Sequence, residues 1–340
     1  MAQHPSMNEA GLHIISASDL LKDDPYVKKC LLAACQENGF FYLDYRSTAL
    51  EKLTELYGVA KDFFELSLEE KLKYDVEGQG PEKYDGYKIA GRSTGPLVGK
   101  RDGFEAFTIP NNSLFSIVPG MALRGPSSIQ KHRTTIKQSV ELMDDLSIRI
   151  LKLLSSALCL PPDRSIESCH RRGQPSTSAL SLLRYLPDTP GSDKAGHMAH
   201  TDIGTLAIVL SMVPGLQVQL PGDSEWRYIA PKPGHAIINV GDCLTFLSNG
   251  RLPSILHRVV PAPGTEEMKY SLGYFLRPEF EAILTDREGK VWRSHDWHCN
   301  KFKVFRASLN EQKAGSYLTG KTGYLGLADP DVGAKAVDAI

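Results

Sequence analysis

The half of the chain that follows residue 177 has the sequence pattern of a β-sandwich or a β-barrel. Its apolar residues come in short β-type runs, and turn-forming groups such as Val213-Pro214-Gly215 and Ser248-Asn249-Gly250 separate most of them. Seven or eight strands of this length indicate a sandwich or barrel, although the count alone does not say which one. The runs are 178–186, 204–212, 215–220, 226–230, 235–247, 255–260 and 269–277.

The first half of the chain is predicted to be mainly helical, with a buried strand inside it. Asp24 and Pro25 fit the start of a helix, and Gly39 stands where a helix cap belongs. A long helix is expected from Pro126 to just before Pro161. Other helices are expected over about 47–66, from Ser67 and in the tail after Trp292, and strands are expected at 13–15, 39–43 and 104–109.

Glycines, prolines, tyrosines and charged residues replace regular periodicity between Gly78 and Gly103. A loop of this length in a compact domain is either functional or a solvated connection, and the sequence leaves both alternatives open. If the loop is functional, we expect it to line a substrate pocket. The residues that are candidates for substrate binding are Tyr84, Tyr87, Arg101 and Phe104.

Two histidines and an aspartate in the β-rich half form a candidate metal site. His200 and Asp202 stand two apart, so in a strand they point to the same face, and His257 follows fifty-five residues after Asp202. Two imidazoles and one carboxylate suit a non-haem ferrous ion and leave coordination positions open. His197 has the opposite strand parity to His200, so we interpret it as a loop or pocket-rim residue. His295 and His298 lack a third partner at zinc-site spacing and are expected at the surface.

Composition and charge exclude several classes of protein. Charged residues make up 23% of the chain and the net charge is −1, so the chain lacks the excess positive charge that binding to nucleic acid or to an anionic membrane requires. The amino-terminal sequence lacks the order of a secretory signal, and no apolar run reaches the length of a membrane span. The six cysteines show no CxxC pairs and are expected to be reduced thiols. These features predict a soluble, cytoplasmic protein, and none of them implies an obligate protein partner.

An ordered set of motifs gives the chain a family resemblance. It resembles the Fe(II)- and 2-oxoglutarate-dependent dioxygenases of the isopenicillin N synthase-like superfamily. This resemblance implies a double-stranded β-helix, or jelly roll, buttressed by amino-terminal helices and a carboxy-terminal helix. It also implies an amino-terminal region at 1–125 and, at 126–340, the long helix with the jelly-roll core and tail. The motifs are Gly39-Phe40-Phe41-Tyr42, Leu183-Arg184-Tyr185-Leu186-Pro187, His200-Thr201-Asp202, Gly215-Leu216-Gln217-Val218, Asn239-Val240-Gly241-Asp242, Leu247-Ser248-Asn249-Gly250-Arg251 and His257-Arg258-Val259.

The same resemblance assigns roles at the site. His200, Asp202 and His257 would bind Fe(II), and 2-oxoglutarate and dioxygen would take the remaining positions. Tyr185 would contact 2-oxoglutarate. The far carboxylate of 2-oxoglutarate meets an Arg-x-Ser motif in the family, whereas this chain has Lys269-Tyr270-Ser271. Lysine keeps the positive charge but lacks the planar fork of arginine. Arg277 shares the strand parity of residue 269, but it stands at the strand end beside Pro278, and we favour Lys269.

The implied activity is the oxidation of a small organic metabolite with release of succinate and carbon dioxide. Hydroxylation, desaturation and oxidative ring formation or rearrangement all fit, and specialised metabolism is the expected setting. One alternative is an Fe(II) and dioxygen oxidase of the isopenicillin N synthase type, which needs no 2-oxoglutarate. A more distant alternative is a non-catalytic β-barrel that binds a metal or a metabolite.

Overall fold

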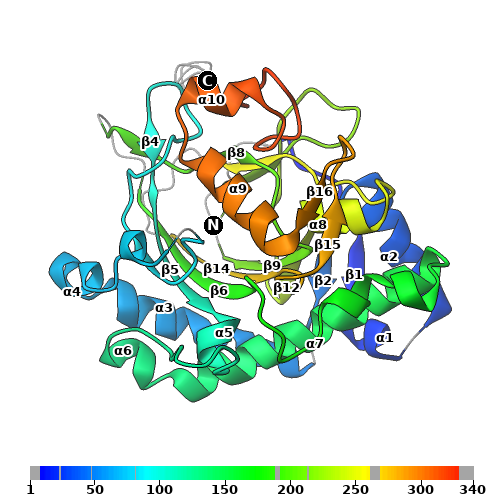
Figure 1. Cartoon of the computed structure of the whole chain (residues 1–340), viewed down its shortest axis with the longest axis horizontal. Helices are drawn as coiled ribbons and strands as arrows, with labels where there is room; N and C mark the ends of the chain where they lie inside the picture. The colour runs from blue at the N-terminus through cyan, green and yellow to red at the C-terminus, as the bar shows by residue number, and fades with distance from the viewer. Residues whose placement is uncertain are drawn as a thin grey trace.

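The chain folds into an open jelly roll of two facing sheets with helices packed on the outside (Figure 1). The computed structural model describes residues 8–22, 24–46, 48–80, 82–187, 192–212, 214–260 and 269–328, with the side chains of Glu51 and Lys269 left out. The predicted fold class, a β core with flanking helices, is confirmed.

The larger sheet has eight strands, and all its neighbouring pairs are antiparallel except β1 with β2. Buried apolar side chains line nearly the whole of β2, β9 and β12. In sheet order the strands are β1 (Ile14–Ser16), β2 (Phe40–Asp44), β12 (His235–Val240), β9 (Leu206–Ser211), β14 (Lys269–Leu276), β6 (Ala179–Tyr185), β5 (Phe104–Pro110) and β3 (Gly86–Lys88).

The smaller sheet has four strands and carries both candidate metal-binding histidines. Its order is β11 (Arg227–Tyr228), β10 (Leu216–Val218), β13 (His257–Val259) and β8 (His197–His200). Two further pairs lie outside the main sheets: β4 (Arg101–Asp102) with β7 (Lys194–Ala195), and β15 (Ile283–Thr285) with β16 (Val291–Arg293).

The predicted strand 235–247 is wrong in its second half. Strand β12 ends at Val240, and helix α8 runs from Asp242 to Leu247. The backbone turns at Gly241, where an added Cβ would lie 2.2 Å from the carbonyl oxygen of Gly204. The amide of Asp242 donates to the carbonyl of Asp202 at 2.8 Å, so the turn is fixed by the metal-site loop rather than by local propensity.

The amino-terminal helices and the long helix cover the outer face of the larger sheet. Figure 1 shows α7 running beneath this sheet. A single hydrophobic cluster includes residues from Ile15 to Leu276 and therefore joins these helices to the strands. The helices are α1 (Ala17–Lys22), α2 (Pro25–Glu37), α3 (Leu56–Phe64), α4 (Leu68–Leu72), α5 (Asn111–Leu114), α6 (Ser127–Gln130) and α7 (Arg133–Ala157), with short 3-10 segments at Ala49–Glu55, Val76–Gly78, Pro162–Arg164 and Ile166–Cys169.

Local signals explain several helix ends. The carboxylate of Asp24 accepts from the amide of Tyr26 at 2.7 Å, and Pro25 opens α2, as predicted. Gly39 adopts φ +60° after that helix, and an added Cβ would lie 2.5 Å from the carbonyl oxygen of Pro253, so only glycine fits. The predicted long helix is interrupted at Lys131 and His132, which separate α6 from α7.

The carboxy-terminal segment packs on the opposite side of the core. Helices α9 (Ser294–Phe305) and α10 (Leu309–Ala314) follow β16, and α9 lies next to β8 in Figure 1. A capping box formed by Ser308 and Glu311 begins α10. Among the described residues, no helix has the length and apolar character needed to cross a lipid bilayer.

Candidate active site

The structure brings His200, Asp202 and His257 together at one end of the smaller sheet. His200 ends β8 and His257 begins β13, and the two residues face each other across the antiparallel ladder. The Nε2 atoms of His200 and His257 lie 3.6 Å and 3.8 Å from Oδ1 of Asp202. The three ligand atoms lie within 4.8 Å of one another, which is close enough for one metal ion to bind all of them.

Asp202 reaches the site from outside a strand. The predicted strand placement is wrong for this residue, because β8 ends at His200. The amide of Thr201 instead donates to the carbonyl of Leu318 at 3.0 Å, and the carbonyl of Asp202 accepts from Asp242. The chain therefore leaves the ladder one residue before Asp202, and the side chains still converge.

Hydrogen bonds to the backbone fix the tautomer of each histidine. Nδ1 of His200 lies 2.8 Å from the carbonyl oxygen of Met198, and Nδ1 of His257 lies 3.0 Å from that of Ile255. A carbonyl oxygen only accepts, so Nδ1 is the protonated nitrogen and Nε2 presents its lone pair to the site. Asn239 donates to Oδ2 of Asp202 at 2.7 Å, which leaves Oδ1 for a metal.

The electrostatic state of these groups also suits a divalent cation. Burial lowers the pKa of His257 to about 4, so its ring is neutral near pH 7. Burial acts to raise the pKa of Asp202, but His257, His200 and Asn239 outweigh it, and the pKa lies well below the usual range. Two imidazole nitrogens and one ionised carboxylate with open positions beside them are the donor set of a non-haem ferrous site. The residues therefore fit the metal that the sequence predicts.

A buried lysine on α9 supports the segment that joins two of these residues. Nζ of Lys301 donates to Oγ1 of Thr201 at 2.7 Å and forms an ion pair with Asp242. Lys301 has no exposed surface, and Thr201 also donates to Asp242 at 3.2 Å. Sequence analysis missed this residue. The one available signal was its position four residues after Trp297, on the buried face of α9.

A narrow cavity of about 110 Å³ extends from the three residues between the two sheets. Tyr185 and Ser271 both line it, as expected for the binding of 2-oxoglutarate, and Ser271 donates to the carbonyl of Leu210 at 3.2 Å. The backbone of Lys269 pairs with Tyr185, but the side chain of Lys269 lies outside the described part of the structure.

A wider cavity of about 170 Å³ shares His200 and Asp202 with the narrow one. Of the four predicted substrate residues, Tyr84 and Phe104 line it. Tyr87 lies instead in the core, with its ring 6.0 Å from that of Phe63. The exposed Arg101 donates to the carbonyl oxygens of Gly91 and Arg92. The structure therefore does not bring Tyr87 or Arg101 to the site.

His197 lies closer to the metal site than its strand parity predicts. It begins β8 and lines both cavities, and its ring centroid is 4.4 Å from that of His200. The ladder between β8 and β13 shifts register between the pairs that involve His257 and Val259. A bulge of this kind re-aims one side chain, which explains why simple alternation failed here.

Helix α9 contributes more to the wider cavity than the sequence indicated. Phe302 and Phe305 line the cavity. The expectation that His298 lies at the surface is wrong, because the residue is 1% exposed and its ring stacks on Phe302 at 5.3 Å. His295 is partly buried and bonds to Glu82 at 2.8 Å.

Comparison with known proteins agrees with this geometry. Residues 177–278 match the model of the 2OG-Fe(II) oxygenase superfamily, and residues 12–126 match that of the amino-terminal region of a non-haem dioxygenase in morphine synthesis. The chain is 35% identical over 306 residues to a 2-oxoglutarate-dependent dioxygenase, ecdG, of Aspergillus rugulosus, covering 87% of this chain and 90% of that one. It is 33% identical to frbH, a 2-oxoglutarate-dependent dioxygenase of a Dothideomycetidae species, over 94% of this chain and 98% of that one.

A solved structure shows the same fold. The crystal structure of a full-length Neurospora crassa protein in complex with alpha-KG superposes with a TM-score of 0.71 at 23% identity, covering 88% of this chain and all of that one. The chain belongs to the 2-oxoglutarate- and Fe(II)-dependent oxygenase superfamily. It is an oxidoreductase that uses Fe(II), 2-oxoglutarate and dioxygen to oxidise a small molecule, which settles the two alternatives left open by the sequence.

The buried pair of Lys301 and Asp242 generates a prediction about stability. Replacing Lys301 with methionine leaves the Asp242 carboxylate buried without its counter-ion, and we expect the free energy of unfolding to fall by about 3–5 kcal/mol. Chemical denaturation measures this change. The control is Lys303→Met, at an exposed position of the same helix, with an expected change of less than about 0.5 kcal/mol. Equal effects of the two substitutions would show that the buried ion pair contributes no more to the free energy of unfolding than an exposed lysine does.

Proposed function

We propose that His200, Asp202 and His257 are the iron ligands of this enzyme. The observation that carries the proposal is the pair of Nδ1 hydrogen bonds to Met198 and Ile255, because they leave both Nε2 lone pairs facing the same carboxylate oxygen. Three protein ligands hold the metal and leave positions for 2-oxoglutarate and dioxygen. Asn239 orients Asp202 by binding the oxygen that the metal does not use.

We further propose that 2-oxoglutarate lies in the narrow cavity, with its far carboxylate near Lys269 and Ser271 and with Tyr185 as a contact. Strand alternation supports this arrangement, since residues 269 and 271 share the face that lines the cavity. Arg184 is a poor substitute for Lys269, because its guanidinium pairs with Glu105 at 2.8 Å and donates to the carbonyl of Phe64. When bound, iron and 2-oxoglutarate supply the oxidation, with succinate and carbon dioxide as co-products.

The substrate is proposed to occupy the wider cavity, in contact with Tyr84 and Phe104. The residues of this chain then position one C–H bond next to the metal and keep water away from it. Phe104, Phe302 and Phe305 give the cavity an apolar wall. Hydroxylation, desaturation and ring closure or rearrangement are all compatible with this task.

A role in specialised metabolism is proposed from the relatives in Aspergillus rugulosus and the Dothideomycetidae species. The net charge of −1 supports a small metabolite rather than a nucleic acid as the substrate. All six cysteines are free, which supports a reducing, cytosolic location. No obligate protein partner is part of this proposal.

Removal of any one ligand tests the metal assignment. We expect His200→Ala, Asp202→Ala and His257→Ala each to reduce succinate formation more than about 100-fold, because the iron loses one of its three anchors and even the outer partners of metal ligands contribute about 10- to 100-fold. Bound iron and succinate are measured in the same samples. The matched control is His235→Ala, at a partly buried histidine on β12 that lies outside both cavities. Full activity with iron bound in any of the three variants would overturn the ligand assignment.

The role of Lys269 gives a separate prediction. Lys269→Ala removes the proposed partner of the far carboxylate, so the KM for 2-oxoglutarate should rise about 10-fold or more while iron binding stays unchanged. Steady-state kinetics and metal analysis measure the two quantities. Lys313→Ala, at an exposed position on α10, should change neither. An unchanged KM in Lys269→Ala would show that another residue binds the far carboxylate of 2-oxoglutarate.

A further inference from the structure

One buried arginine next to the metal centre has charge and hydrogen-bonding capacity that the protein does not use. Arg277 follows β14 directly. Its position has the same strand parity as Ser271 and Phe275, which lie on the face that points into the core of the jelly roll. It lines the wider cavity together with His200 and Asp202, and only 9% of its surface is exposed. Placement at the strand end therefore does not remove Arg277 from the site, although it argues against a role beside Lys269.

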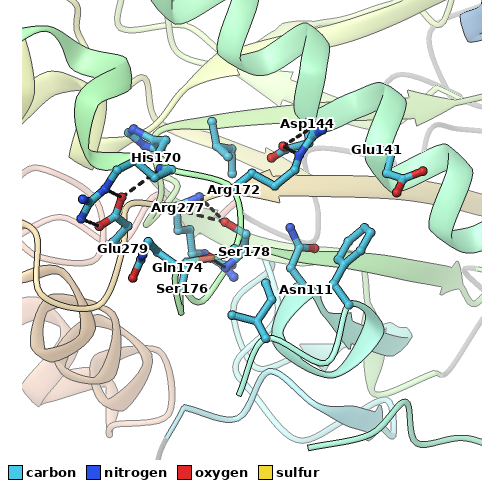
Figure 2. Close-up of a pocket in the computed structure, with 15 residues that line it drawn as sticks. Asn111, Glu141, Asp144, His170, Arg172, Gln174, Ser176, Ser178, Arg277 and Glu279 are labelled. Carbon is cyan, nitrogen blue, oxygen red and sulfur yellow. Dashed lines mark hydrogen bonds and ion pairs between the residues drawn. The ribbon is translucent and has the colours of Figure 1, made fainter. Parts of the chain in front are cut away.

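The hydrogen bonds of Arg277 occupy only one side of its guanidinium. Nη1 donates to the carbonyl oxygen of Thr177. The backbone amide donates to Oγ of Ser178 at 2.9 Å (Figure 2). Nε is buried without a partner. Nη2 also has no partner among the described residues, and it keeps some exposed surface because it is not among the fully buried atoms. Within the described part of the chain, the edge formed by Nε and Nη2 therefore has no hydrogen-bond partner.

This same edge binds a carboxylate at other arginines of the chain. Arg171 donates from Nε and Nη2 to the two oxygens of Glu279 at 2.8 Å and 2.6 Å. Arg46 binds Asp44 in the same way at 3.0 Å and 2.8 Å. Two parallel N–H groups match the two oxygens of a carboxylate, so the free edge of Arg277 has the shape of an unfilled carboxylate site.

The charge of Arg277 is present at physiological pH. Burial lowers its pKa to about 10, and the nearby Asp202 acts in the opposite direction. The guanidinium is therefore protonated near pH 7. Within the described part of the chain, no carboxylate forms an ion pair with it. A buried charge without a counter-ion is unusual in a folded protein and is expected where a ligand supplies the opposite charge.

The charges around Arg277 indicate the side from which an anion would bind. Arg277 also borders a second cavity, shown in Figure 2, whose lining includes the carboxylates of Glu141, Asp144 and Glu279. Arg171 and Arg172 line that cavity too and pair with Glu279 and Asp144, so the lining residues other than Arg277 add no net positive charge there. On the side of His200, the described lining residues include three further cations but Asp202 as the sole carboxylate, which a metal would neutralise. The three cations are Lys83, Lys88 and Arg306.

Those three cations differ from Arg277 because each has an acidic partner outside the cavity. Lys88 pairs with Asp102 at 2.9 Å, and Lys83 pairs with Glu77 at 3.3 Å. Arg306 also pairs with Glu77. They add a positive potential to the cavity, but their strongest interactions are already made. Among the described lining residues of this cavity, Arg277 is the lysine or arginine that has no acidic partner.

We propose that Arg277 binds a carboxylate of the substrate through its Nε and Nη2 groups, and that the natural substrate is a small carboxylic acid with an apolar body. The apolar part fits against the cavity wall that includes Phe104, Phe302 and Phe305. This inference rests on the proposed function, since it places the substrate in the wider cavity beside the iron.

The carboxylate that we assign to Arg277 belongs to the substrate and is not the far carboxylate of 2-oxoglutarate. Ser271 and Arg277 stand six residues apart along an extended segment, which is about 20 Å. One molecule of 2-oxoglutarate is too short to contact both. Ser271 lines the narrow cavity, which does not include Arg277. The two anions therefore have separate binding sites, in two cavities that share His200 and Asp202.

Anaerobic equilibrium dialysis tests the proposal without turnover. The protein is loaded with Fe(II) and one equivalent of 2-oxoglutarate, and the probes are phenylacetate, 3-phenylpropanoate and hexanoate with their matched amides. We expect the best-bound acid to bind about 10- to 100-fold more tightly than its amide. This comparison uses the unmodified protein. Equal binding of acids and amides, or no binding of any acid, would overturn the proposal.

Three variants separate a direct contact from a general effect of charge. Arg277→Met should abolish the preference for the acid, and Arg277→Lys should retain part of it, since lysine keeps the charge without the fork. Arg306→Met removes a cation of the same cavity that is already paired, and it should weaken acid binding less than about 3-fold. Unchanged acid binding in Arg277→Met, or equal losses in Arg277→Met and Arg306→Met, would overturn the proposal.

Binding of 2-oxoglutarate in the same dialysis samples separates this inference from the proposed function. If 2-oxoglutarate fails to bind to the iron-loaded protein, the proposed function fails as well. If 2-oxoglutarate binds but Arg277→Met leaves the binding of the acids unchanged, the inference alone fails. If Arg277→Met weakens the binding of 2-oxoglutarate itself, Arg277 binds the cosubstrate, and the inference is again overturned.

Discussion

The site depends on the pairing of β8 with β13, which sets His200 directly opposite His257. Each ring is then held by the carbonyl oxygen two residues earlier in its own segment, Met198 for one and Ile255 for the other. The ring centroids are 4.3 Å apart. The backbone thus fixes two lone pairs beside the carboxylate of Asp202 before any metal arrives, which is how a protein prepares a high-affinity cation site.

Two buried cations near this site differ in how their charge is balanced. Lys301 is fully enclosed, and its charge is matched by Asp242 and by a hydrogen bond to Thr201, so it stabilises the loop between the metal-site residues. Arg277 is nearly as deeply buried, but one edge of its guanidinium lacks a partner among the described residues. The first arrangement holds the structure together, and the second is suited to a ligand that brings its own negative charge.

Sequence periodicity and motif order predicted much of the fold and the centre of the site. The alternating runs gave the strands of both sheets, and the spacing of His200, Asp202 and His257 gave the convergent cluster. The errors arose where tertiary contacts override local rules. A register shift between β8 and β13 turns His197 toward His200, and the loop packed against Gly241 ends β12 early. Neither feature leaves a trace in the alternation of apolar residues.

Residues distant along the chain were the hardest to predict. Lys301 lies one hundred residues after Thr201, and the pattern of α9 alone does not show which element that helix covers. The place of Arg277 at the strand end beside Pro278 argues only against a role as the substitute for Lys269, and its side chain borders the wider cavity. Only the folded arrangement shows which of its donors are used.

Anaerobic titration of the Fe(II)-loaded protein with 2-oxoglutarate tests whether iron held by His200, Asp202 and His257 chelates 2-oxoglutarate. We expect a weak visible metal-to-ligand charge-transfer band that grows and saturates near one equivalent. His257→Ala should fail to develop this band. Bound iron with no band in the unmodified protein would show that the iron does not chelate 2-oxoglutarate.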